Sequence, residues 1–119
     1  MIMIEATEED LSDSIWALTS IEASKSPLKF KIGAAIIDKK NRLVAVGHNS
    51  TKTHPKYGSK SPWNTMHAEG AALYNCKKLG IDPKGMTMII YRRGGLCKPC
   101  PDCQKLIEKA KINKVIYTW

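Results

Sequence analysis

The sequence predicts an α/β protein with three layers, α-β-α, built around a mixed sheet of at least four strands. Three features of the pattern support this fold class. Helix start and stop signals bracket three segments, short apolar runs of strand length lie between them, and helices alternate with strands after one probable hairpin. The predicted order is therefore α-β-β-α-β-α-β. A hairpin followed by two strand–helix–strand units implies helices on both faces of the sheet.

The first predicted helix lies in the acidic N-terminal region. Thr7 can cap its start, and the acidic turn at 8–10 favours the positive helix N-terminus. Pro27 ends the helix. Between these limits apolar residues recur at helical spacing, at Leu11, Ile15, Leu18 and Ile21.

A hairpin and a long loop follow this helix. Residues 30–38 contain an apolar run at 32–37, residues 38–41 have the composition of a turn, and residues 43–46 form the return strand. The loop at 50–63 is rich in Ser, Thr, Lys and Pro. Connections longer than about 12 residues are uncommon in compact domains and are often functional.

The second half of the chain supplies the remaining helices and strands. The second helix is expected to start near Asn64 or Thr65 and to stop at Gly80, because glycine commonly ends a helix. After it come a strand, a third helix and a closing strand, at residues 86–91, about 100–111 and 114–119.

Length and composition indicate one soluble domain. A chain of 119 residues with 43% hydrophobic and 25% charged residues is typical of a single globular domain, so one domain is predicted over 1–119. Its apolar stretches are shorter than the roughly 18–20 residues of a membrane helix. The N-terminus lacks the basic region of a signal peptide. We therefore expect a cytoplasmic protein without a membrane partner.

The positive charge of the chain is unevenly placed. The formal net charge is +8, yet residues 1–22 carry six acidic residues and no Lys or Arg. The rest of the chain therefore carries all 19 basic residues and only five acidic ones. Such a field attracts phosphates, but a solvated lysine-rich surface has the same composition. Charge alone leaves nucleic-acid binding open.

Two short motifs carry the chemistry. His67, Ala68 and Glu69 lie near the start of the second predicted helix, and Cys100 and Cys103 lie at the start of the third. Cysteines three apart share one helix face and can bind one ion, and the positive helix end favours the thiolates that zinc requires. His67 supplies a third ligand from another helix. Three ligands leave the fourth tetrahedral position open for water, as in catalytic zinc sites.

Other roles compete around this site. Glu69 is the natural proton carrier rather than a ligand, and it also suits the helix N-terminus electrostatically. Cys97 could complete a closed four-ligand site, which would make the chain a non-catalytic, zinc-stabilised nucleic-acid-binding module. Cys76 is expected to be a buried apolar filler.

The two motifs match the His-x-Glu and Pro-Cys-x-x-Cys signature of zinc deaminases, and over residues 30–119 the chain resembles the cytidine and deoxycytidylate deaminase superfamily. The resemblance implies a cytidine-deaminase-like fold and one Zn2+ per chain, bound by His67, Cys100 and Cys103. It also implies that a zinc-bound hydroxide attacks C4 of cytosine. In the mechanism that the resemblance implies, Glu69 first moves a proton from the zinc-bound water to N3, which forms that hydroxide, and later gives a proton to the amino group that leaves as ammonia.

The prediction of the substrate depends on the resemblance and on the composition of one loop. The resemblance makes Asn49 a candidate sugar ligand, and Ala68, Lys52 and Arg92 are further candidate substrate contacts. We expect a (deoxy)cytidine nucleotide similar to dCMP, while a nucleoside stays open. Aromatic residues interleaved with lysines in the loop at 50–63 support an alternative, a deaminase acting on cytosine or adenine in single-stranded nucleic acid or tRNA.

The partners of the chain are expected to include further copies of itself. The sequence stops just after the last predicted strand, which would leave an exposed sheet edge or one covered by a partner chain. A homo-oligomer is therefore expected. The loop at 50–63 contains no cysteine, so a second zinc is not expected.

Overall fold

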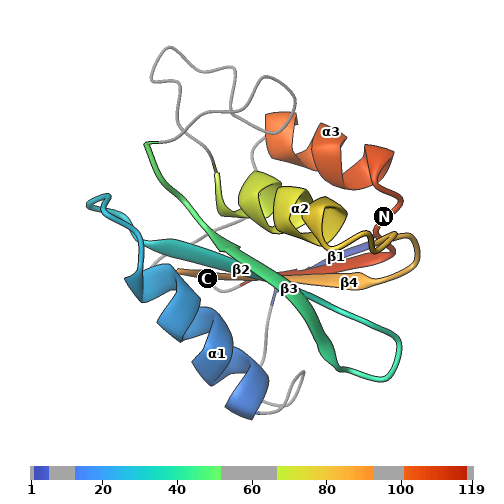
Figure 1. Cartoon of the computed structure of the whole chain (residues 1–119), viewed down its shortest axis with the longest axis horizontal. Helices are drawn as coiled ribbons and strands as arrows, with labels where there is room; N and C mark the ends of the chain where they lie inside the picture. The colour runs from blue at the N-terminus through green and yellow to red at the C-terminus, as the bar shows by residue number, and fades with distance from the viewer. Residues whose placement is uncertain (1, 6–12, 52–66, 93–100, 118–119) are drawn as a thin grey trace.

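The computed structural model describes residues 2–5, 13–51, 67–92 and 101–117. In chain order the elements are β1 (Ile2–Glu5), α1 (Asp13–Ser24), β2 (Ile32–Ile37), β3 (Leu43–His48), α2 (Ala68–Lys78), β4 (Thr87–Arg92), α3 (Pro101–Lys109) and β5 (Lys114–Tyr117). The strands form one sheet, with α1 on one face and α2 and α3 on the other (Figure 1). The predicted three-layer α/β fold is confirmed.

The sheet has the strand order β1-β5-β4-β2-β3. β2 pairs antiparallel with β3 and β4, whereas β4 and β1 both lie parallel to β5. The order predicted from the sequence omits β1, and it therefore predicts that one edge of the last strand is open or covered by a partner chain. In the structure β1 of the same chain pairs with this edge of β5, with Ile2 opposite Lys114. That expectation was wrong for a physical reason. Four residues are too few to show a clear strand period, and only the distant β5 gives them a partner.

Helix α1 packs on the sheet with a different face from the one that its apolar spacing indicates. Leu18 and Ile21 are 45% and 56% exposed. The close approach of α1 to β2 depends on Gly33, because a Cβ at this position would lie 2.8 Å from the backbone nitrogen of Ala23. The buried face of α1 consists of Ile15, Thr19, Glu22 and Ala23.

The predicted hairpin is confirmed as β2 and β3. Asp38 closes its turn: one carboxylate oxygen accepts hydrogen bonds from the backbone N–H groups of Lys40 and Arg42, both at 2.9 Å. Asn41 has a φ of 61°, a left-handed conformation that asparagine tolerates better than most residues.

Helix α2 lies directly against β3. A Cβ on Gly47 would lie 2.7 Å from the carbonyl carbon of Ala71, so only glycine permits this approach. Further along the pair, the side-chain amide of Asn75 donates a hydrogen bond to the backbone carbonyl of Val46 at 2.7 Å. The position of α2 is therefore set by backbone contact with an edge strand of the sheet.

The side chains of β4 alternate between the two faces of the sheet. Met88 and Ile90 belong to the larger core cluster, under α2 and α3, and Met86 packs against it. Ile89 belongs to the smaller cluster under α1. Met86, Met88 and Ile90 therefore share the face of the sheet that α2 and α3 cover.

The start of α2 differs from the predicted one. The helix begins at Ala68, because His67 has extended backbone angles (φ −76°, ψ 156°). The predicted start at residues 64–65 lies outside the described residues. The predicted end is confirmed, since Gly80 lies just beyond the helix with a φ of 73°.

Helix α3 ends at Lys109, before the predicted end, and Lys111 has a φ of 61° that no right-handed helix accommodates. Among the helices of the described ranges, none is long and apolar enough to cross a membrane.

Candidate metal centre

Three potential metal ligands come together at the N-terminal ends of α2 and α3. The ligand atoms of His67, Glu69 and Cys103 all lie within 4.8 Å of one another. His67 directly precedes α2, and its carbonyl accepts a helical hydrogen bond from the N–H of Ala71 at 3.0 Å. Cys103 lies in the first turn of α3 and is 2% exposed. Two helix starts on either side of β4 in the sequence therefore contribute to one site.

The described donors fit a zinc ion. Nδ1 of His67 lies 3.1 Å from Sγ of Cys103. Zinc bonds of about 2.05 Å to nitrogen and about 2.3 Å to sulfur, at a tetrahedral angle, separate the two atoms by about 3.6 Å. The pair would have to open by only about half an ångström to hold the ion. Imidazole and thiolate are both preferred ligands of zinc, so the chemistry and the spacing agree.

Glu69 is buried beside these donors, with 5% of its surface exposed. Burial raises the pKa of its carboxyl above the ordinary value of 4.5, while its own backbone N–H, the charge on His67 and hydrogen bonding with Cys103 act in the opposite direction. A carboxyl group whose pKa is shifted toward neutrality can both accept and release a proton during a reaction. The location of Glu69 thus suits proton transfer at a metal centre.

Among the candidate site residues named from the sequence, three lie outside the described ranges, as do Thr7 and Leu11 of the first predicted helix. The three site residues are Cys100, which directly precedes α3, Lys52 and Cys97. Cys100 as a metal ligand and Lys52 as a substrate contact therefore stay predictions, and so does the competing role of Cys97.

Asn49 holds the end of β3 against the segment that leads into β2. Its side-chain oxygen accepts a hydrogen bond from the N–H of Ile32 at 2.9 Å, and its amide nitrogen donates one to the carbonyl of Phe30 at 2.6 Å. The residue is 7% exposed. This structural role was not predicted. The contact of Asn49 with a sugar stays a prediction, and it would use the second amide hydrogen or lone pair.

The other two predicted substrate contacts occupy different environments. Ala68, the first residue of α2, is fully buried in the core, and its contact with a substrate stays a prediction. Arg92 is the last residue of β4, and its guanidinium carbon lies 4.6 Å from the centre of the Phe30 ring. Phe30 itself was not singled out from the sequence.

A second polar cluster lies on the α1 face of the sheet. Nδ1 of His48 lies 2.5 Å from one carboxylate oxygen of Glu22, and Nζ of Lys25 lies 3.2 Å from the other. This cluster was not predicted from the sequence. Strand alternation from Gly47, which faces α2, would have placed His48 on the α1 side. Its location separates it from the candidate metal centre.

Cys76 is confirmed as a buried core residue. Its side chain is fully buried, and its thiol donates a hydrogen bond to the carbonyl of Ile81 at 3.3 Å. Burial raises the pKa of the Cys76 thiol above 9.0. The group is therefore protonated and unreactive at neutral pH.

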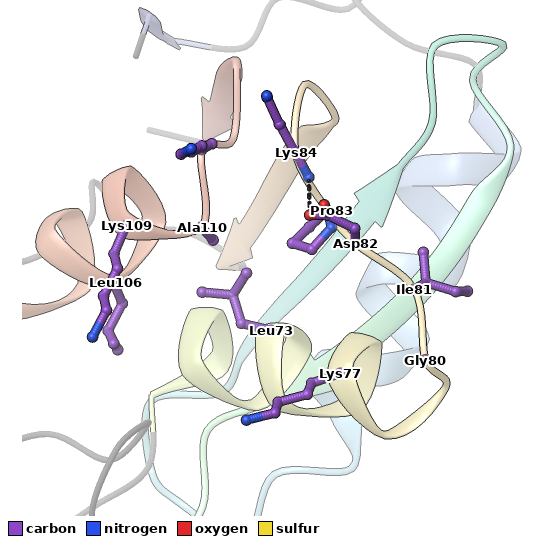
Figure 2. Close-up of a pocket in the computed structure, with 11 residues that line it drawn as sticks. Leu73, Lys77, Gly80, Ile81, Asp82, Pro83, Lys84, Leu106, Lys109 and Ala110 are labelled. Atoms are coloured by element: carbon purple, nitrogen blue, oxygen red, sulfur yellow. Dashed lines mark hydrogen bonds between the residues drawn. The ribbon is translucent and has the colours of Figure 1, made fainter.

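A cavity of about 650 Å³ opens at the opposite ends of α2 and α3 (Figure 2). Leu73 and Leu106 contribute apolar walls, and Lys77, Lys84 and Lys109 are among its basic residues. None of the three clustered metal donors lines it. The candidate chemistry therefore lies at the N-terminal ends of these helices, and this cavity at their C-terminal ends.

Comparison with known proteins agrees with this geometry. Residues 12–119 match the family described as the cytidine and deoxycytidylate deaminase zinc-binding region. Deoxycytidylate deaminase of Homo sapiens is 31% identical over 114 residues, which cover 85% of this chain and 59% of that protein. The probable deoxycytidylate deaminase of Drosophila melanogaster is 27% identical over 121 residues, with 85% and 54% covered. The apo crystal structure of dCMP deaminase from the cyanophage S-TIM5 has a TM-score of 0.68 and 25% identity, covering 90% of this chain and 84% of that one.

The chain belongs to the cytidine and deoxycytidylate deaminase family. The zinc-binding character of this family and the cluster of His67, Glu69 and Cys103 fit the predicted single zinc ion per chain. The chain spans between half and three fifths of the length of the curated relatives named above.

Proposed function

We propose that residues 1–119 form one deaminase domain. This domain catalyses the hydrolytic removal of the amino group from C4 of cytosine in a deoxycytidine nucleotide similar to dCMP. The observation that carries this proposal is the grouping of a buried carboxyl group, Glu69, with the metal donors His67 and Cys103 within 4.8 Å. Hydrolytic deamination in this class needs a bound metal and an adjacent group that exchanges protons; His67 and Cys103 offer ligands for the first, and Glu69 is a candidate for the second.

The roles divide between the residues as follows. His67, Cys103 and the predicted Cys100 would hold zinc, leaving one coordination position for the reaction. Bound zinc lowers the pKa of a coordinated water to about 7 and so supplies a nucleophile at neutral pH. Glu69 would take one proton from the attacking water and pass it to N3 of the base, and would then take the second proton of that oxygen and pass it to the departing amino group, which leaves as ammonia. The burial of Glu69 keeps bulk water away from this transfer.

The choice of substrate rests on the relatives. Two curated proteins with 27% and 31% identity are named deoxycytidylate deaminases, which supports a monophosphate over a free nucleoside. The predicted homo-oligomer and cytoplasmic location stay predictions.

The decisive experiment measures ammonia release from dCMP by the zinc-loaded protein and its Glu69→Gln variant. The variant keeps the size and hydrogen-bonding capacity of the side chain but cannot shuttle protons, so we expect the rate to fall at least about 100-fold with zinc retained. Glu108→Gln, at an exposed position of α3, is the matched control. Full activity of Glu69→Gln would contradict the proposal and favour a non-catalytic zinc module.

The same assay on three substrates tests the substrate class. We expect dCMP to be preferred over deoxycytidine and over a cytosine-containing single-stranded oligonucleotide. Dominant activity on the oligonucleotide that falls steeply with added salt would instead establish the polynucleotide alternative.

A further inference from the structure

Phe30 is an exposed aromatic side chain on a tightly held backbone. It is the only phenylalanine of the sequence and is 56% exposed. Its carbonyl accepts a hydrogen bond from Asn49, which also accepts one from the N–H of Ile32. The backbone on both sides of residue 31 is thus anchored to the end of β3. An exposed apolar ring on an anchored backbone presents a constant surface to a ligand.

The guanidinium group of Arg92 lies over the ring of Phe30. In the β2–β4 pairing Arg92 lies opposite Ile32, two residues from Phe30, and its guanidinium carbon is 4.6 Å from the ring centre. The ammonium group of Lys29 lies 5.6 Å from the same ring. A cation above an aromatic face is attracted to it and loses orientational freedom. Phe30 therefore restricts where the Arg92 guanidinium can point.

This pair lies at the same end of the sheet as the candidate metal centre. Along α2, Asn75 contacts Val46 of β3 and Ala71 contacts Gly47. Moving toward the start of α2 therefore means moving toward the end of β3, where Asn49 binds the Phe30 backbone.

The pair also lies on the correct face of the sheet. Met88 and Ile90 of β4 face α2 and α3, and strand alternation places Arg92 on that face as well. The metal donors lie at the starts of these two helices, with His67 directly before α2 and Cys103 in the first turn of α3.

We propose that Arg92 binds the phosphate of the substrate and that Phe30 is a positioning residue that holds its guanidinium group, so that the pair selects nucleotides over nucleosides. This inference rests on the proposed deamination of a cytosine nucleotide. The planar fork of arginine donates two parallel hydrogen bonds to phosphate oxygens. His67, Glu69 and Cys103 supply no such group.

The first test compares dCMP with deoxycytidine in the zinc-loaded protein. For Arg92→Gln we expect the ratio of kcat/KM for dCMP over deoxycytidine to fall about 10- to 100-fold, the size of a lost hydrogen bond to a charged group. Arg92→Lys keeps the positive charge but loses the planar fork of donors, so its kcat/KM ratio should lie between those of the wild type and Arg92→Gln. Arg42→Gln removes one positive charge at the hairpin turn, at the other end of β2, and should leave the ratio unchanged.

The second test asks whether Phe30 acts through Arg92. Phe30→Leu should lower the same ratio about two- to fivefold, the size of an exposed cation–π interaction, and Phe30→Tyr should preserve it. In a protein that already carries Arg92→Gln, Phe30→Leu should have no further effect on the ratio, because its only route to the phosphate is gone. An independent, additive loss would overturn the positioning role.

A binding measurement separates this inference from the proposed activity. Calorimetry with dUMP and deoxyuridine should show tighter binding of dUMP, and Arg92→Gln should reduce that preference by the same factor. Equal binding of the two ligands by the wild type, or an unchanged preference in Arg92→Gln, overturns the inference. An Arg92-dependent dUMP preference without deamination of any substrate would instead overturn the proposed activity alone. Thermal denaturation checks that each variant is folded. If Arg92→Gln does not fold, the same comparisons are made with Arg92→Lys and Phe30→Leu.

Discussion

The Nδ1 atom of His67 lies 3.1 Å from the Sγ atom of Cys103, although 36 positions separate the two residues in the chain. The contact exists because α2 and α3 pack on the same face of the sheet and start at the same end of it (Figure 1). Helix starts are favourable places for thiolate ligands, since the helix dipole lowers thiol pKa values there.

Cys103→Ser should lose zinc. A serine hydroxyl stays protonated at neutral pH and is a poor replacement for a thiolate ligand. We expect about one zinc ion per wild-type chain by elemental analysis after dialysis against a weak chelator, and clearly less in the variant. Cys76→Ala, which removes a buried thiol outside the cluster, is the control. Wild-type zinc content in Cys103→Ser would show that Cys103 is not a ligand.

Gly47→Ala should destabilise the fold and weaken zinc binding together. The new methyl group would lie 2.7 Å from the Ala71 carbonyl carbon, so α2 must shift, at a cost of about 1–3 kcal/mol. Gly33→Ala is the matched control, because it forces α1 away from the opposite face. Both variants should unfold at lower denaturant concentration, but only Gly47→Ala should lose zinc more easily to a competing chelator. Equal zinc affinity in the two variants would contradict this reading of α2.

Asn49→Ala should lower stability even without any ligand. The substitution leaves the N–H of Ile32 and the carbonyl of Phe30 without their side-chain partner, which costs about 1–3 kcal/mol when such groups are shielded from water. Chemical denaturation of the substrate-free protein measures the effect, with the exposed Asn113→Ala as control. If Asn49→Ala altered only substrate binding and left the free energy of unfolding unchanged, the structural role assigned to this side chain would be wrong.

Asp38→Asn should reduce stability at neutral pH but not in acid. Hydrogen bonding from the Arg42 backbone, with further contributions from the Arg42 side chain and the Lys40 backbone, holds the pKa of Asp38 below 3.8 despite some desolvation. Because the folded-state pKa is lowered, the carboxylate stabilises the fold above the unfolded-state pKa and loses this contribution as pH falls through the folded-state value. The difference between wild type and variant should therefore be small but measurable at pH 7 and should shrink below about pH 4. A difference that grows in acid would contradict the assignment.

Local patterns predicted much of the fold and site. The β2–β3 hairpin, the end of α2 at Gly80 and the start of α3 near residue 100 follow from a few neighbouring residues each. The same holds for the chemistry, since His67 and Glu69, like Cys100 and Cys103, are close in sequence. Their residue types and spacing indicate zinc chemistry without any knowledge of the distances between them.

Contacts between distant segments were missed. The pairing of β1 with β5, the buried face of α1 and the His48–Glu22 contact each depend on a partner far away in the chain. Leu18 is an example, because it is exposed although it is apolar and helically spaced. Helical spacing alone does not determine which apolar residues of a helix pack against the sheet.

The sequence by itself determined the class of the fold and the type of chemistry, because helix signals, turns and ligand spacing are local properties of the chain. Tertiary structure decided how the site is assembled. Only packing brings His67 to Cys103, buries Glu69 beside them and raises the pKa of its carboxyl. Packing also places Arg92 on Phe30. These relationships depend on how closely helices approach the sheet and on strand register, which are set by contacts between residues far apart in the chain.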